Sequence, residues 1–189
     1  YLIDAWRKDI VHITKNAFAS LANRVAKRKG IAKVGNANIV ADNLEEGDLV
    51  FIDPPYSGVH YSRFYHVLET IAHGGCGKVT GVGRYPDVEF RPRSNYSISS
   101  ESRPALDDLL KKIASRHANA ILTFPDHDCS NGLSGNMVRE TASKYFHLEE
   151  YSVESKFSTL GGRGDGEENQ AGRDARRNAN ELILLLKPK

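Results

Sequence analysis

Apolar residues recur at steps of three and four along the first part of the chain. Between positions 2 and 28 they are Ile3, Trp6, Ile10, Ile13, Ala17, Leu21 and Val25. This spacing is the period of an amphipathic helix, and Gly30 is a residue type that commonly ends one. We therefore predict a basic amphipathic helix within residues 1–33.

Further along, short apolar runs without polar alternation stand between polar turns, at 38–40, 48–52 and 120–124. Runs of this kind are typical of strands that are buried on both faces of a parallel sheet. Two later segments, 147–157 and 181–186, also have strand character and are joined by a loop instead of a helix. We expect these two strands to form an antiparallel hairpin at one edge of the sheet.

Helical periodicity alternates with these strands, at 64–72, 104–116 and 136–146. Strands that alternate with helices predict an α/β fold, here a three-layer sandwich with a largely parallel sheet. Residues 74–103 and 158–178 show neither period. Because long stretches without periodicity inside a domain are usually functional or mobile, we predict mobile loops there.

The composition is that of an ordinary globular protein. The chain has 189 residues, of which 40% are hydrophobic and 26% charged. No apolar run approaches the roughly 20 residues that span a bilayer, so we expect no membrane association. Cys76 and Cys129 alone make neither a disulfide framework nor a zinc site, which favours a reducing cytoplasm.

The net charge of +2 hides an uneven distribution. Residues 1–33 carry eight lysines and arginines against two aspartates, whereas the remainder holds 18 basic and 22 acidic residues. A basic segment of this kind either lies near a polyanion or is a solvated helix face. Charge alone favours the solvated face.

The most informative stretch is Asp53-Pro54-Pro55-Tyr56, directly after the apolar run 48–52. Two consecutive prolines lack N–H groups and fix φ, so the backbone is rigid and its carbonyls are free to act as acceptors. Asp53 adds a carboxylate acceptor, and Tyr56 adds a flat aromatic face. Two fixed acceptors beside an aromatic ring suit a planar amino group. The alternative is a rigid turn after a strand, which the aromatic residues that follow make less favourable.

This tetrapeptide resembles the signature of S-adenosylmethionine-dependent amino-group methyltransferases, above all the Dam-type DNA adenine N6 enzymes. Three further segments resemble that family in the same order: the strand and loop at 121–128, the hairpin at 155–163 and the terminal strand at 177–188. The resemblance covers residues 36–189 and implies a Rossmann-like methyltransferase fold.

The resemblance also implies roles for individual residues. Asp53, Pro54, Pro55 and Tyr56 would hold the amino group of a flipped adenine, and Asp42, Asn43 and Asp53 would face the cofactor. Asp42 could equally be a plain cap at the end of a strand. The residues expected to contact nucleic acid are Tyr61, Arg63, Tyr65, Arg91, Arg93, His127 and Arg163. Tyr61, Arg63 and Tyr65 either line the site or pack internally, and residues 74–103 either order on the DNA backbone or pack on the protein.

One part of the family pattern is not found in the sequence. The glycine-rich cofactor loop and the target-recognition domain precede Asp-Pro-Pro-Tyr in the family, and the glycines at 74–77 and 81–83 follow a helix instead of a strand. We therefore expect a missing N-terminal half or a second subunit to supply both. The predicted setting is the prokaryotic or phage cytoplasm, in a restriction–modification system.

Two alternative functions stay open, an RNA amino-group methyltransferase and a nucleic-acid-binding subunit without turnover. A metal site is not expected. Residues 126–129 include Asp, His and Cys, but adjacent residues cannot all converge on one tetrahedral ion. We interpret this segment as a loop on the substrate side.

Overall fold

The computed structural model describes residues 7, 9–75, 77–82, 85–158 and 176–189. The chain divides into two compact units, residues 1–35 and residues 36–189. Within the described residues, no helix is long and apolar enough to cross a membrane.

The described part of the first unit contains one helix, α2 (Ile10–Ala22). Its start is fixed by Asp9, whose carboxylate accepts hydrogen bonds from the backbone N–H groups of Val11 and His12 at 2.9 and 3.1 Å. The helix ends earlier than predicted, and residues 24–35 are not helical. Arg24 and Arg28 would be like-charged neighbours one turn apart in a longer helix, which disfavours its continuation.

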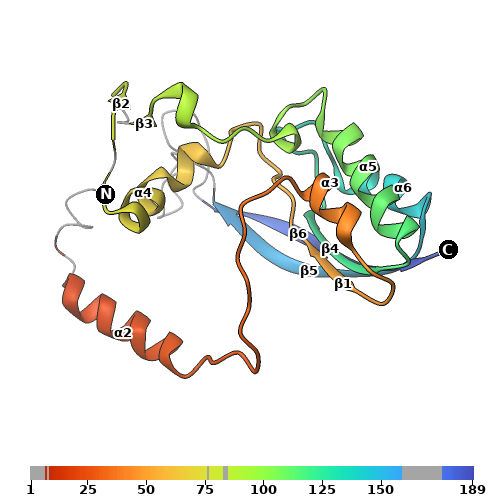
Figure 1. The fold of residues 1–189 in the computed structure, drawn as a ribbon, viewed down its shortest axis with the longest axis horizontal. Helices are drawn as coiled ribbons and strands as arrows, with labels where there is room; N and C mark the ends of the chain where they lie inside the picture. The colour runs from red at the N-terminus through yellow and green to blue at the C-terminus, as the bar shows by residue number, and fades with distance from the viewer. Residues whose placement is uncertain (1–6, 8, 76, 83–84, 159–175) are drawn as a thin grey trace. The chain divides into compact units, whose positions relative to one another are not determined.

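The second unit is built on a four-stranded sheet (Figure 1). The strands lie in the order β1 (Leu49–Ile52), β4 (Asn119–Pro125), β6 (Arg176–Pro188) and β5 (Phe146–Ser158). Only β1 and β4 are parallel; the other two pairings are antiparallel. The expected edge hairpin is therefore confirmed, but the expectation of a largely parallel sheet is wrong for the described strands, which form a mixed sheet.

The sheet lacks the strand that was expected at 38–40. Residues Ala37–Val40 form a short helix, α3, which continues into the 3₁₀ turn η1 (Ala41–Asn43). The side chain of Asn36 caps α3, and the amide of Asn38 donates to the Ala105 carbonyl at 2.8 Å and to the Asp108 carboxylate at 2.7 Å. These polar contacts hold the segment against α5 (Ser102–Ser115), so it does not join the sheet.

Two helices, α5 and α6 (Gly135–Ser143), cover one face of the sheet (Figure 1). Alternate residues of β4 and β6 point into this layer and are buried, as the two-residue period of a strand requires. The fully or nearly fully buried core includes Leu106, Leu110, Ile113, Ala120, Leu122, Phe124, Val138, Ala142, Leu182, Leu184 and Leu186.

The opposite face of the sheet is open in the described unit. Leu49 and Phe51 of β1 are 67% and 66% exposed, and Tyr151 and Val153 of β5 are about half exposed. The described residues of this unit thus form two layers, a mixed α/β arrangement. A third layer is not seen in them.

The region between β1 and α5 is more ordered in its secondary structure than the sequence suggested. After α4 (Ser62–His73) come a small two-stranded ribbon, β2 (Val79–Thr80) with β3 (Tyr85–Pro86), and the 3₁₀ turns η2 (Val88–Phe90) and η3 (Asn95–Ser97). At the ends of the second predicted loop, 158–178, Ser158 belongs to β5 and residues 176–178 belong to β6. Residues 159–175 lie outside the described part of the chain.

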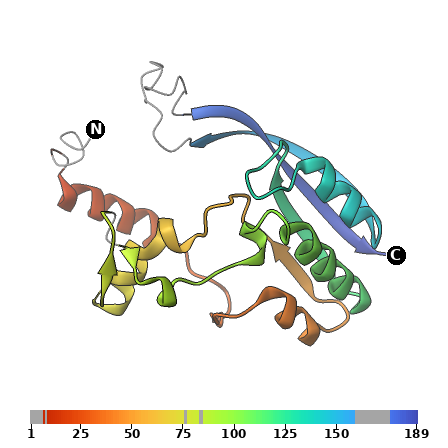
Figure 2. The same ribbon diagram turned by 90° about the horizontal axis from the view of Figure 1, so that it is seen from above.

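The hairpin extends past the rest of the sheet (Figure 2). The last pair that links β4 to β6 is Pro125 with Glu181. β5 and β6 stay paired beyond this point, from Glu154 with Asn180 to Ser158 with Arg176. This overhang lies at the carboxyl end of β4, which is also the end of β1 where Asp53 follows, because β1 and β4 are parallel.

A charged cluster anchors the end of β4 to the helical layer. The Arg139 guanidinium of α6 donates two hydrogen bonds to the Asp126 carboxylate, at 2.7 and 2.8 Å, and two to Glu150 of β5, at 2.6 and 2.9 Å. Bidentate pairs of this kind are strong and fix orientation. Gly135 permits the close packing, because a Cβ at this position would lie 2.1 Å from an Asp126 carboxylate oxygen.

Replacing Arg139 by Met should lower stability in a pH-dependent way. The hydrogen bonds from Arg139 hold the pKa values of Asp126 and Glu150 below their usual range. Their contribution is therefore fully present above the unfolded pKa values, near 4, and is lost as the pH falls through the folded ones. We expect Arg139→Met to lower the free energy of unfolding by about 2 kcal/mol at pH 7 and by much less near pH 2, measured by urea denaturation.

Arg103→Met is the matched control. Arg103 makes a single 3.3 Å contact with Glu140, and both side chains are well exposed, so we expect a change within about 0.5 kcal/mol. An equal loss for Arg139→Met at both pH values would contradict the role of the ion cluster.

Candidate functional site

Asp53-Pro54-Pro55-Tyr56 leaves the sheet at the carboxyl end of β1. Ile52 and Pro54 are buried, whereas Asp53 and Tyr56 are exposed. The neighbouring strand contributes Thr123, one residue beyond the Ile52–Leu122 pair, and its hydroxyl donates to the Asp53 carboxylate at 3.3 Å. The sheet thus places a carboxylate and an aromatic ring together at its open edge, where ligands of α/β proteins bind.

An aromatic group stands beside this edge. Tyr61 makes edge-to-face contacts with Phe64 and Tyr65, with ring centroids 6.5 and 5.4 Å apart. Burial raises the pKa values of Tyr56 and Tyr61, and the negative charges of neighbouring groups, Asp53 among them, raise these pKa values further. Two of the predicted site residues, Tyr56 and Tyr61, therefore lie near Asp53, and a third, Tyr65, packs against Tyr61. The phenols of Tyr56 and Tyr61 remain neutral at physiological pH.

Glu181 is a carboxylate near the site to which the sequence analysis gave no role of its own. It lies opposite Pro125 in the β4–β6 pairing. Burial raises the pKa of Glu181, the charge of Asp53 raises it further, and His127 lowers it. The terminal-strand pattern that includes Glu181 was recognised in the sequence, but only the antiparallel register shows that this residue comes near Asp53.

The arginines of the predicted DNA surface differ in their surroundings. Arg91 donates to the Pro86 carbonyl at 2.7 Å and to the Thr80 hydroxyl at 3.0 Å, so it holds the β2–β3 ribbon together. Arg63 lies 5.0 Å from the centre of the Tyr85 ring and stacks on it. Arg93 is exposed and is the better candidate for a phosphate contact. Arg163 lies outside the described residues.

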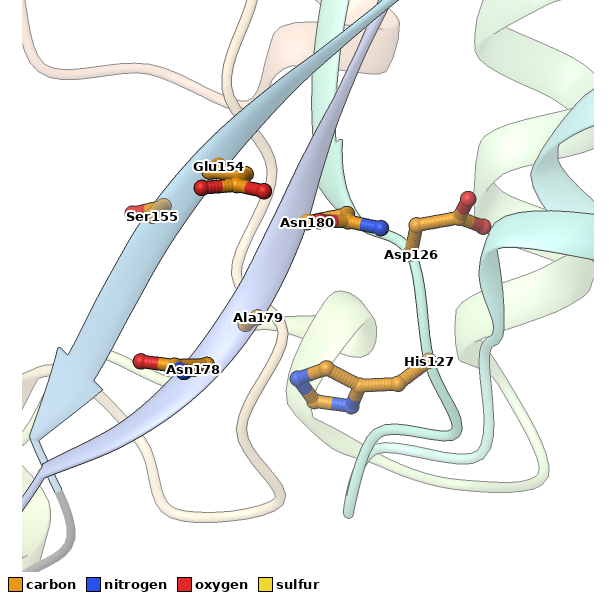
Figure 3. Close-up of a pocket in the computed structure, with 7 residues that line it drawn as sticks. All are labelled: Asp126, His127, Glu154, Ser155, Asn178, Ala179 and Asn180. Carbon is orange, nitrogen blue, oxygen red and sulfur yellow. The ribbon is translucent and has the colours of Figure 1, made fainter.

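His127 lines a pocket of about 580 Å³ between the overhanging hairpin and the loop after β4 (Figure 3). Glu154, Asn178 and Asn180 line it from the hairpin, and the carboxylate of Asp126 points away from them (Figure 3). Amides and carboxylates are the groups that read the edges of nucleobases. The lining of the pocket therefore offers both hydrogen-bond donors and acceptors.

The two predicted cofactor residues of η1 are placed differently from Asp53. Asp42 is paired with Lys112 of α5 at 3.3 Å, and the same ammonium donates to the Asn38 carbonyl at 2.8 Å. This side of the structure belongs to the helical layer. The structure gives Asp42 a role in packing, and its role toward a cofactor stays a prediction, as does that of Asn43.

Two of the glycines after α4 have other roles in the described part of the chain. Gly74 is the left-handed cap of α4, and Gly81 turns the chain between β2 and β3. Neither joins the end of a strand to the start of a helix, which a phosphate- or cofactor-binding turn requires. Among the described residues, no group of three or more His, Cys, Asp or Glu side chains could hold a metal ion.

Comparison with known families decides the relationship. Residues 7–122 match the D12 class of N6 adenine-specific DNA methyltransferases. The chain belongs to this family. The match confirms the resemblance drawn from Asp53-Pro54-Pro55-Tyr56 and extends it to the N-terminal side, because it begins at residue 7 and so includes α2. The segments after residue 122 that also resemble the family lie outside the matched range.

Individual relatives are modification enzymes. Modification methylase LlaI of Lactococcus lactis subsp. lactis is 40% identical over 72 residues, or 38% of this chain and 11% of the relative. Type II methyltransferase M.FokI of Planomicrobium okeanokoites has the same identity and coverage. Modification methylase StsI of Streptococcus sanguinis is 31% identical over 82 residues, or 43% of this chain and 12% of the relative.

This member of the D12 family thus spans about a tenth of the length of the curated relatives it matches. No solved structure matches it at a significant level. The matched region contains Asp53 and the aromatic group around Tyr56, whereas Thr123, His127 and Glu181 lie beyond it.

The aromatic group has a measurable signature. Burial and nearby negative charge raise the pKa of Tyr61 to about 12, against about 10 for a free tyrosine. We expect the ring resonances of selectively labelled Tyr61 to remain those of the neutral phenol past pH 10. Tyr56→Phe should lower the midpoint, because it removes one neighbouring charge. A midpoint near pH 10 in the unsubstituted protein would contradict the arrangement of these rings.

Proposed function

We propose that this chain is the target-base half of the catalytic domain of a DNA adenine N6-methyltransferase that modifies DNA in a prokaryotic or phage restriction–modification system. Family membership and the modification methylases among its relatives support this. The observation that carries the proposal is the position of Asp53 and Tyr56 together at the carboxyl edge of the parallel pair β1 and β4, beside Tyr61 and Tyr65.

In the proposed reaction the target adenine leaves the duplex, at a cost of a few kcal/mol. Stacking on the Tyr56 ring returns roughly 1–3 kcal/mol of this. The Asp53 carboxylate and the Pro54 carbonyl each accept a hydrogen bond from the adenine amino group. With both N–H bonds engaged, the nitrogen lone pair is directed out of the amino plane. Asp53 also stabilises the positive charge that develops as the nitrogen is alkylated.

The hydrogen bond from the Thr123 hydroxyl sets the orientation of the Asp53 carboxylate. Thr123 donates to one carboxylate oxygen, which leaves the remaining lone pairs of Asp53 for the base. Because Asp53 directly follows β1 and Thr123 lies on the adjacent parallel strand β4, this contact is maintained by the sheet itself. Holding the acceptor in place before the base arrives reduces the entropy lost on reaching the reactive geometry.

S-adenosylmethionine would supply the methyl group as an electrophile on a sulfonium. The described residues do not fit this group by themselves, because Asp42 is paired with Lys112 and no glycine-rich turn joins a strand to a helix in them. We propose that a further segment, on the same polypeptide or a second subunit, brings this loop and the recognition domain.

The same segment would complete the three-layer sandwich. Leu49 and Phe51 expose an apolar face on β1, and β1 has a partner on only one side among the described strands. Parallel strands are normally buried on both faces. Helices of the additional segment, laid on this face, would bury these side chains.

The pocket beside His127 is proposed to receive a nucleotide next to the target base. Glu154, Asn178 and Asn180 offer hydrogen-bond donors and acceptors to a base edge. The overhanging hairpin carries them at the edge where Asp53 lies, so a duplex docked on that edge would meet them.

Replacing Asp53 by Asn should abolish methyl transfer without unfolding the protein. The carboxylate is exposed and lies outside the core, so the change removes charge and one acceptor but little packing. We expect a loss of at least about a thousandfold in kcat, from the electrostatic and hydrogen-bonding role together. The measurement is transfer of tritiated methyl groups from S-adenosylmethionine to duplex DNA, with the chain and the segment that completes its domain.

Asp48→Asn at the opposite end of β1 is the matched control. Its carboxylate accepts from the Glu45 N–H in a turn, and we expect wild-type transfer. If the protein methylated RNA in preference to DNA, the proposal of a DNA substrate would be wrong and RNA would be the substrate. No transfer to either by the unsubstituted protein would favour a binding subunit.

The arginines give a test of the DNA surface. Arg93→Met should lower the slope of log K against log salt for DNA binding by about one, because one phosphate contact is lost. Arg91→Met should leave the slope unchanged, because its guanidinium already binds Pro86 and Thr80. Both effects should be the same for specific and non-specific DNA. An unchanged slope for Arg93→Met would exclude Arg93 from the interface.

A further inference from the structure

The loop after β4 contains a fully buried amide, Asn131. Its two N–H bonds donate to the carbonyls of Pro55 and Tyr96, at 2.8 and 2.9 Å. Its side-chain oxygen accepts from the Leu133 N–H at 3.2 Å. Buried amides are normally hydrogen-bonded, and here one of the two carbonyls that Asn131 binds belongs to the second proline of the catalytic tetrapeptide.

The preceding residue holds the other side of Tyr56. The Gly58 N–H donates to the Ser130 hydroxyl at 3.0 Å. The two backbones are also in close contact, because a Cβ on Gly58 would lie 2.8 Å from the Ser130 carbonyl oxygen. Ser130 and Asn131 therefore contact the catalytic loop on both sides of Tyr56, at Gly58 and at Pro55.

The two prolines explain why such contacts matter. Pro54 and Pro55 have no N–H, so a backbone hydrogen bond can hold them only through their carbonyls. Their rings fix both φ angles and leave only the ψ angles free. A hydrogen bond to the Pro55 carbonyl fixes the peptide plane between Pro55 and Tyr56. Together with the contact at Gly58, it restrains the backbone on both sides of Tyr56 and so limits the directions in which the ring leaves the backbone.

The turn that carries Ser130 and Asn131 is itself rigid. Gly132 adopts a positive φ of 87° and lies against Ser99, where a Cβ would be 2.5 Å from the hydroxyl oxygen. The Cys129 N–H donates to the Leu133 carbonyl at 2.8 Å. The buried Ser102 of α5 donates to the Asn131 carbonyl at 2.8 Å, which ties the turn to the core.

We propose that Ser130 and Asn131 are positioning residues that form a two-point clamp on the catalytic loop and fix the stacking face of Tyr56. They touch neither the base nor the methyl donor and act through the loop. The proposal rests on the proposed methyltransferase function, because its catalytic consequence is a loss of turnover when the Tyr56 ring is no longer held.

Ser130 carries the test because it is exposed, so its replacement leaves the core intact. Asn131→Ala would remove the hydrogen bonds to the carbonyls of Pro55 and Tyr96 and is expected to unfold the loop. Ser130→Ala removes the hydroxyl that binds Gly58, and we expect kcat to fall about tenfold while KM for S-adenosylmethionine stays unchanged, since misplaced groups lose rate before binding. Ser130→Thr keeps the hydroxyl and should recover kcat to within about threefold of wild type.

Ser134→Ala is the matched control. Ser134 caps α6 through its hydroxyl, so its loss lowers stability by about 1 kcal/mol without touching the catalytic loop. We expect an unchanged kcat for this variant. An equal fall in kcat for Ser134→Ala, or no recovery with Ser130→Thr, would overturn the clamp.

A second measurement does not depend on turnover. With 3-fluorotyrosine at position 56, Ser130→Ala should shift or broaden the fluorine resonance, whereas Ser134→Ala should not. This result would support the clamp even if the protein transferred no methyl group, so a failure of the proposed function is separated from a failure of the clamp. An unchanged resonance in Ser130→Ala would overturn it.

Discussion

The parallel pairing of β1 with β4 is the constraint on which the site depends. Parallel strands bring their carboxyl ends to the same edge, so Asp53 after β1 and the loop after β4 meet there. Thr123, Ser130 and Asn131 then reach the catalytic loop from a single neighbouring segment. An antiparallel pairing would have placed the carboxyl ends of β1 and β4 at opposite ends of the sheet.

Much of the fold could be predicted because the hydrophobic core leaves a clear pattern. β1, β4, α5 and the edge hairpin follow apolar runs and helical stripes that the core requires. The segment at 38–40 could not be assigned in this way, because three apolar residues fit a strand or a helix equally well. Contacts from Asn38 to a helix some 70 residues later decided it, and such contacts leave no local trace in sequence.

The candidate site likewise contains some residues that the sequence predicts and others that only the tertiary structure reveals. Asp53 and Tyr56 belong to a tetrapeptide whose chemistry can be read directly, and Tyr61 and Tyr65 follow it closely in sequence. Asn131 lies in Ser-Asn-Gly, which reads as an ordinary turn, and its contact with Pro55 depends on tertiary structure alone. Arg91 shows another kind of contact that sequence does not reveal: its charge indicates a phosphate contact, and the structure adds hydrogen bonds from its guanidinium to the Pro86 carbonyl and the Thr80 hydroxyl.

The open face of the sheet affects how this polypeptide behaves during recombinant production. Leu49 and Phe51 project from a short strand whose outer edge has no partner among the described residues. Unpaired strand edges with apolar side chains promote pairing between chains and aggregation. Recombinant production of the isolated chain should therefore favour inclusion bodies, and co-expression with the segment that covers this face should favour recovery of folded material.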